Sequence, residues 1–138
     1  MANRLFTPDE VNALIPTLTL LIARMQQRGA ELRRAVSEAM RARGGGEEPI
    51  TVAELLRLQP QVEPAAEEME SMLRQLEASG GQFKGLDLGL VDFPAEIDGE
   101  SVLLCWQYGE REVGFYHSVD GGFAGRKALP RTRSQLLQ

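Results

Sequence analysis

Apolar residues recur at alternating intervals of four and three over the first third of the chain, and no other feature constrains the fold as strongly. The positions are Val11, Ile15, Leu18, Ile22, Met25, Gly29, Leu32, Val36 and Ala39. This heptad spacing places one apolar stripe along a single helix, as in helices that pack against a partner helix. The segment Thr7–Glu10 opens the pattern with a capping threonine, a proline at the first helical position and a glutamate that completes a capping box. The sequence therefore predicts a long helix that begins at residue 8.

A second helical segment follows a turn of three glycines at residues 44–46. The residues Ile50–Glu54 repeat the start signal, and the apolar positions that follow are Leu55, Leu58, Val62, Ala65, Met69, Met72 and Leu76. Pro60 and Pro64 predict a break near residues 59–64, because proline cannot continue a helix without disturbing it. Two helices joined by a glycine turn predict an antiparallel, coiled-coil-like helical hairpin over residues 7–80.

The two helical segments differ in the sign of their net charge. Residues 1–43 carry seven arginines and four acidic residues, whereas residues 44–100 carry three basic and thirteen acidic residues. We expect the two helices to present complementary charged faces to each other. The whole chain has a net charge of -5. This charge argues against a nucleic-acid binder that depends on bulk attraction.

Glycines and aromatic residues are concentrated in the last 60 residues, which indicates strands and turns. Asp98-Gly99 predicts a two-residue type I′ hairpin, and Gly109-Glu110 predicts a type II′ hairpin. The first turn pairs Ile97 with Glu100, Ala95 with Val102, Phe93 with Leu104 and Val91 with Trp106. The second turn pairs Tyr108 with Arg111, Trp106 with Val113, Leu104 with Phe115 and Val102 with His117. The sequence thus predicts a three-stranded antiparallel β-meander over residues 88–119 that packs on the first helix.

This register sorts the strand residues onto two faces of the meander. The core face comprises Val91, Phe93, Ala95, Val102, Leu104, Trp106, Val113 and Phe115, with His117 at its end. The second face comprises Asp92, Pro94, Leu103, Cys105, Gln107, Glu112, Gly114 and Tyr116. The second face carries apolar, polar and charged residues together, whereas a face exposed to solvent is richer in charged residues. We expect either the loop of residues 120–130 or a partner subunit to cover it.

Together these elements predict an α+β fold in which the helical hairpin packs against the meander. A length of 138 residues fits one domain. We expect that domain to span residues 1–130, with a wrapping loop at 120–130 and a flexible tail at 131–138. The chain has no run of about 18 apolar residues and no visible secretory signal, so we expect no membrane span. The single Cys105 fits a reducing cytoplasm.

His117 is the only histidine and the strongest candidate for chemistry. It would serve as a general base or metal ligand at the edge of the sheet, with Arg126, Asp120 and Glu112 as possible neighbours. The alternative is a histidine at a strand end that bonds only to the backbone. With Tyr116 added, a pocket at the sheet edge would bring together Asp92, Glu112, Tyr116, His117 and Arg126.

Asp92, Glu112 and His117 are the candidate metal ligands. Carboxylates bind divalent cations, and Asp92 and Glu112 share one face in the predicted register. Ordinary surface acids explain both carboxylates equally well. One cysteine and one histidine cannot complete a closed Cys/His zinc site within one chain. In this register Cys105 and His117 point to opposite faces, which argues against a Cys/His dyad.

The glycine-rich run before Arg126 is not followed by a helix pattern, so it is not a phosphate-binding loop of the helix N-terminal kind. Arg126 itself would bind an anion or pair with Asp92.

Several short motifs resemble an uncharacterised bacterial family, the domain of unknown function DUF2203. They are Phe6–Asn12, Gly89–Pro94, Leu104–Trp106, Gly109-Glu110, Tyr116-His117 and Gly122–Arg126. The resemblance extends over nearly the whole chain, to about Leu129. It implies no particular reaction, substrate or cofactor.

Two functional hypotheses follow. The first is a cytoplasmic, non-enzymatic interaction or oligomerisation module, which acts as a homodimer or with a protein partner and needs no cofactor. The second is a small enzyme or a metal- or anion-binding domain, with its site at the sheet edge around His117. Neither a membrane nor a nucleic acid is an expected partner.

Overall fold

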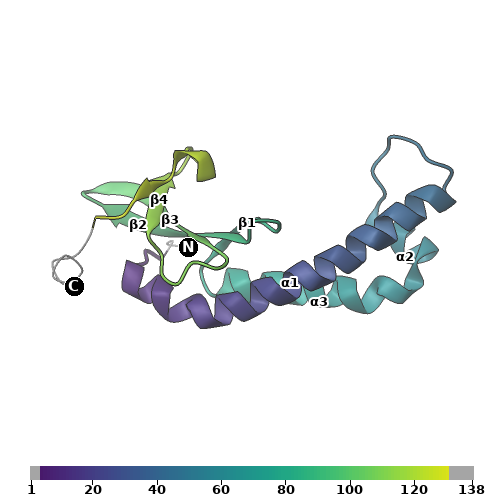
Figure 1. Cartoon of the computed structure of the whole chain (residues 1–138), viewed down its shortest axis with the longest axis horizontal. Helices are drawn as coiled ribbons and strands as arrows, with labels where there is room; N and C mark the ends of the chain where they lie inside the picture. The colour runs from purple at the N-terminus through teal and green to yellow at the C-terminus, as the bar shows by residue number, and fades with distance from the viewer. Residues whose placement is uncertain (1–3, 131–138) are drawn as a thin grey trace.

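The computed structural model describes residues 4–130 and shows an α+β fold. Helix α1 (Pro8–Ala42) runs antiparallel to α3 (Glu63–Ala78), and the short α2 (Val52–Leu58) lies at the far end of this pair (Figure 1). Thr7 and Glu10 form the expected capping box at the start of α1. The predicted α+β fold and the long first helix are therefore confirmed, whereas the predicted second helix is divided into α2, a 3₁₀ turn and α3. The proposed tail at 131–138 lies outside the described residues.

The second arm of the hairpin is broken where the prolines predict a break. Helix α2 ends at Leu58, a single 3₁₀ turn η1 spans Pro60–Val62, and α3 begins directly afterwards. Thr51 caps α2 by accepting a hydrogen bond from the backbone N–H of Glu54. The reciprocal half of this predicted capping box is missing, because the Glu54 carboxylate lies 3.6 Å from Arg43 Nη1 instead.

The charges of the two arms face each other as expected. Arg24 and Arg28 of α1 both pair with Glu68 of α3. Pairs at exposed positions each contribute only about 0–1 kcal/mol. They therefore help to set the alignment of the helices, while the apolar stripe supplies most of the stability.

The sheet has five antiparallel strands in the order β1-β2-β3-β4-β5, so the prediction of three strands is wrong in number. The strands are β1 (Gln82–Gly85), β2 (Leu90–Ile97), β3 (Glu100–Gln107), β4 (Phe115–Ser118) and β5 (Lys127–Ala128). Strands β1 and β5 extend the meander at its two edges. β1 has four residues and β5 only two, so neither is long enough for its sequence pattern to identify it as a strand.

The hairpin between β2 and β3 has the predicted register. Asp98 and Gly99 both have positive φ angles, 52° and 81°, as a type I′ turn requires. Ile97 pairs with Glu100, Ala95 with Val102, Phe93 with Leu104 and Val91 with Trp106.

The predicted register between β3 and β4 is wrong by one residue. Leu103 pairs with His117, Leu104 with Tyr116 and Cys105 with Phe115. The connection is a loop over residues 108–114, in place of a two-residue turn. A shift of one residue moves every side chain of a strand to the opposite face. His117 and Phe115 therefore lie on the second face, and Tyr116 lies on the core face.

Contacts with distant parts of the chain hold this loop. The backbone N–H of the buried Val113 donates to Oδ1 of Asn12 in α1, at 2.7 Å. The indole N–H of Trp106 donates to the carbonyl of Glu110 at 3.0 Å, and Leu129 N–H donates to the carbonyl of Gly114. These bonds keep Val113 in the core but outside the strand ladder. The register between β3 and β4 therefore differs by one residue from the predicted one.

The main core lies between the apolar stripe of α1, helix α3 and one face of the sheet. Its largest fully buried side chains are Trp106, Phe93, Leu18, Ile22, Met25, Leu76 and Leu104. Gly29 leaves room for Leu86 of the β1–β2 loop, because a Cβ at residue 29 would collide with Cδ2 of Leu86.

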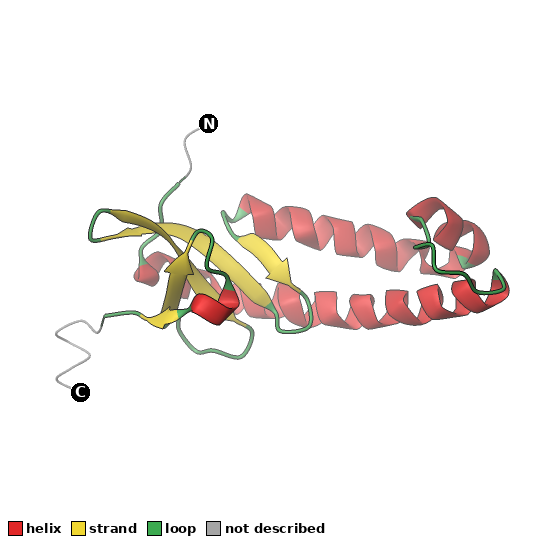
Figure 2. Ribbon diagram, turned by 90° about the horizontal axis from the view of Figure 1, so that it is seen from above, coloured by secondary structure: helices red, strands yellow, loops and turns green. Residues whose placement is uncertain are grey.

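The helical hairpin extends well beyond the sheet (Figure 2). A second, smaller apolar cluster closes its far end, formed by Ala35, Ala39, Leu55 and Val62. Within residues 4–130, no helix combines the length and apolar character needed to cross a membrane.

Candidate metal centre

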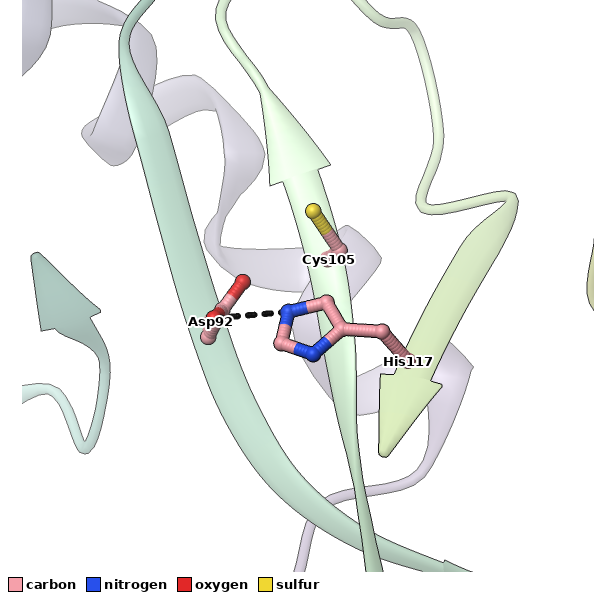
Figure 3. Close-up of side chains that lie close together, drawn as sticks. All are labelled: Asp92, Cys105 and His117. Carbon is pink, nitrogen blue, oxygen red and sulfur yellow. Dashed lines mark hydrogen bonds and ion pairs between the residues drawn. The ribbon is translucent and has the colours of Figure 1, made fainter. Parts of the chain in front are cut away.

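The second face of the sheet brings together one side chain from each of three neighbouring strands. Asp92 comes from β2, Cys105 from β3 and His117 from β4 (Figure 3). Asp92 and Cys105 are direct partners across the ladder, and His117 follows Phe115, the partner of Cys105, by two residues on the same face. One donor atom from each residue lies within 4.8 Å of the other two. Asp92 and His117 are each 2% exposed, and Cys105 is completely buried.

Hydrogen bonds fix the orientation of the His117 ring. Its Nδ1 lies 2.7 Å from the backbone carbonyl of Ser118, and its Nε2 lies 2.9 Å from Oδ2 of Asp92. A carbonyl oxygen can only accept, so Nδ1 carries a proton and donates it to Ser118. Nε2 of the neutral ring therefore points a lone pair at Asp92. The contact between Nε2 and Oδ2 then holds one proton, which belongs either to the imidazole or to the carboxyl group.

The other carboxyl oxygen of Asp92 is buried and lacks a partner. Within the described part of the chain, no group donates a hydrogen bond to Oδ1. A buried polar atom left in this state costs about 1–3 kcal/mol. Such an atom in a native fold calls for an explanation, and a bound ion is one of the usual ones.

The Cys105 thiol is held in its protonated form. Burial first, and then the negative charge of Asp92, raise the pKa of this thiol to about 12. Only the thiolate is a good nucleophile, so Cys105 is not poised for covalent catalysis near neutral pH. A bound divalent cation would reverse this preference, because a coordinating thiol loses its proton.

A hollow of about 290 Å³ lies over the cluster, and Asp92, Cys105 and His117 are among the residues that line it. The sheet supplies its floor, and the loop that follows β4 supplies its outer wall. The remaining lining residues are Lys84, Leu90, Val119, Asp120, Gly122 and Phe123. Asp120, Gly122 and Phe123 of the segment that follows β4 therefore lie over this part of the second face.

Comparison with known proteins places the chain in a family. The sequence profile of DUF2203, described as an uncharacterized conserved protein, matches residues 4–129. The chain belongs to the DUF2203 family. No curated protein matches the chain, and no solved structure matches it.

The predicted site of this DUF2203 protein is only partly assembled. Asp92 and His117 meet, as the metal-site hypothesis requires but against the predicted register, whereas Glu112 is exposed on the loop of residues 108–114. Tyr116 is also excluded, because it packs on the core face. The predicted separation of Cys105 and His117 onto opposite faces is wrong, and Cys105 replaces Glu112 in the cluster.

Arg126 lies beside the cluster and not in it. Its Nη2 donates to both carboxylate oxygens of Glu110, at 2.9 and 3.0 Å, and to the carbonyl of Cys105. Its guanidinium lies 3.9 Å from the ring centre of Phe115 and 4.9 Å from that of Phe123. The expected pairing with Asp92 is therefore replaced by an ion pair with Glu110. Through Phe123, this stack holds the outer wall of the hollow against the sheet.

No signal in the DUF2203 sequence could have revealed Cys105 as a member of the cluster. Along residues 113–116, either Val113 and Phe115 or Gly114 and Tyr116 can face the core. The sequence pattern therefore fits both registers of this strand. The choice depends on the length of the loop, which contacts with α1 determine.

Proposed function

We propose that this protein is a metal-binding domain that holds one divalent transition-metal ion, Zn²⁺ being the best fit. The ligands are a carboxylate oxygen of Asp92, the thiolate of Cys105 and Nε2 of His117. The observation that carries the proposal is the convergence of three different, almost fully buried donor groups within 4.8 Å.

The donor types select the class of metal. Magnesium and calcium prefer sets of oxygen ligands, whereas thiolate and imidazole suit zinc and its neighbours in the first transition row. Three protein ligands also match zinc sites that keep a fourth position open. A cytoplasmic location, where thiols stay reduced, would keep Cys105 available as a ligand.

The hydrogen bond from Nδ1 of His117 to Ser118 supports the same assignment. Histidines that bind metals through one ring nitrogen almost always donate the other N–H to a carbonyl or carboxylate. Nε2 thus already faces Asp92 before a metal arrives.

Proton and charge balance also favour a divalent ion. Without metal, the cluster holds two exchangeable protons, one on the Cys105 thiol and one between His117 and Asp92. An incoming M²⁺ would release both, leaving a thiolate, a carboxylate and a neutral imidazole around the ion. The net charge of the buried cluster is zero before and after, so no uncompensated charge is buried.

Titration of the chelator-treated protein with Co²⁺ tests this proposal, because cobalt–thiolate charge-transfer absorption reports on the ligand as well as on binding. We expect one Co²⁺ per chain, with two protons released in weakly buffered solution. Loss of an outer-shell partner typically costs about 10–100-fold in affinity, so loss of a ligand in Cys105→Ala or His117→Gln should cost at least about 100-fold.

Glu112→Gln is the matched control, because Glu112 is an exposed acid on the nearby loop and should leave cobalt binding unchanged. Circular dichroism of each variant separates loss of the site from loss of the fold. Equal Co²⁺ binding by wild type, Cys105→Ala and His117→Gln would overturn the proposal.

The projecting hairpin supports a second candidate, the interaction module expected from the sequence. Leu20 on α1 is 75% exposed and Val52 at the start of α2 is 68% exposed. Val52 lies at the far end of the hairpin, and Leu20 lies between two residues of the main core beside the sheet. Exposed apolar side chains on the helices suit contact with a second copy or a partner protein. Light scattering tests the homodimer, and a monomeric mass across a wide concentration range would contradict it.

A further inference from the structure

Resting on the metal site proposed above, we propose that the hollow admits a small carboxylate or phosphate anion as the fourth ligand of the metal. Lys84 supplies a positive charge at the mouth of the hollow. The protein would then bind a small oxyanion reversibly, and the ion would not be sealed by protein ligands alone.

The position of the three ligands leaves one side of the metal open. All three come from one face of one sheet, and all three line the hollow. Among residues 4–130, no further histidine, cysteine, aspartate or glutamate joins the cluster. The fourth position of a tetrahedral ion would therefore face the hollow.

The hollow has room for a small anion together with water. A water molecule occupies roughly 30 Å³ of liquid, so a volume of about 290 Å³ corresponds to about ten waters. Acetate or inorganic phosphate needs only part of this space. Leu90, Val119 and Phe123 line the remaining wall, and an apolar wall strengthens the attraction between an anion and the metal.

Two opposite charges stand at the rim of the hollow, so the attraction for an anion comes from the metal and from Lys84. The thiolate and the carboxylate neutralise the divalent ion, which remains a Lewis acid that accepts lone pairs from oxygen donors. Two other ionisable side chains, Lys84 and Asp120, line the hollow, and both are exposed. Neither forms an ion pair with another residue in the described range. Lys84 would attract an anion, and Asp120 would oppose it.

Cobalt spectroscopy tests the inference with defined probes. The Co²⁺-loaded protein is titrated with acetate and, separately, with inorganic phosphate, at constant ionic strength set with a bulky weakly coordinating salt. We expect a saturable shift of the cobalt d–d bands by at least one of the two anions.

Two charge variants and a matched control test whether the anion binds in the hollow. A single exposed charge at the rim contributes little, so Lys84→Gln should weaken anion binding by a factor of about 1.4 to 5, and Asp120→Asn should strengthen it by a similar factor. Arg57→Gln removes the same charge from an exposed position on α2, at the far end of the hairpin, and should have no effect.

The outcomes separate the two proposals. Failure of Co²⁺ to bind would overturn the metal site and this inference together. Binding of Co²⁺ with d–d bands that respond to neither anion, or with bands that are lost because the anion removes the ion, would overturn only the inference. Equal weakening by Lys84→Gln and Arg57→Gln would show an effect of net charge and contradict the role of Lys84.

Discussion

The two hairpins that share strand β3 are closed in different ways. Two residues with positive φ angles join β2 to β3, so the geometry of the turn alone aligns the strands. A longer loop joins β3 to β4, and hydrogen bonds to α1 and to the residues after β4 hold it in place. The first hairpin is therefore determined locally, and the second is determined by the packed molecule. The candidate metal centre depends on both, because its three ligands come from the three strands involved.

The largest effect is expected from Asn12→Ala, which acts on the second hairpin alone. The buried N–H of Val113 would lose its acceptor, a change that costs about 1–3 kcal/mol. Because this bond helps to set the position of β4, we also expect weaker Co²⁺ binding through His117. Urea denaturation and cobalt titration measure the two effects.

Asn12→Asp provides the control for this variant, because its carboxylate can still accept from Val113. It should retain most of the stability and of the cobalt affinity. Full cobalt affinity in Asn12→Ala would show that the register of β4 does not need this contact, which would weaken the contrast between the hairpins.

A smaller and purely local effect is expected from Gly99→Ala in the first hairpin. Gly99 has a φ of 81°, and a Cβ in this left-handed region costs about 1–2 kcal/mol. Nothing lies within 4 Å of the added Cβ, so the cost comes from the backbone alone. We expect lower stability in urea with unchanged Co²⁺ affinity in the folded protein. A drop in affinity as large as that of Asn12→Ala would mean that the two hairpins do not act independently.

The effect that is smallest at neutral pH concerns the thiol between the two hairpins, because it appears only in alkaline solution. The pKa of Cys105 rises from its ordinary value of 9.0 to about 12 in the metal-free fold. As the pH rises, the unfolded chain loses this proton first, so alkaline conditions favour unfolding. The protonated thiol thus contributes its full stability below pH 9, and this contribution falls progressively as the pH rises toward about 12.

Urea midpoints of the chelator-treated protein measure this dependence. Just above pH 9, wild type should begin to lose stability relative to Cys105→Ala, which carries no thiol. Parallel curves for the two proteins over the alkaline range would contradict the assigned cause.

The helical half of the fold was predictable because its signals are local. The capping box of Thr7 and Glu10 and the glycine turn of residues 44–46 act within a few residues of one another. The break near Pro60 follows equally from the missing backbone N–H of proline. The apolar stripe from Val11 to Met25 identified the face of α1 that is buried against the sheet and α3.

The candidate site was predictable only in part. Asp92 lies in a strand aligned by a local turn, so its face was correctly assigned. The face of His117 was not, because Gly109-Glu110 carries the signal of a tight turn and yet belongs to a longer loop. In that loop Glu110 accepts from Gln107 N–H and pairs with Arg126, contacts that no short-range pattern could show.

The sequence by itself determined the long helix α1, the break in the second helical arm, the β2–β3 register and the core face of those two strands. These features follow from backbone preferences and from apolar spacing, which act over a few residues. Only the tertiary structure decided the register of β4, the two edge strands and the meeting of Cys105 with His117. Their energies come from contacts between segments far apart in the chain, such as Asn12 with Val113. The face on which the only histidine lies could therefore be decided only in the packed molecule.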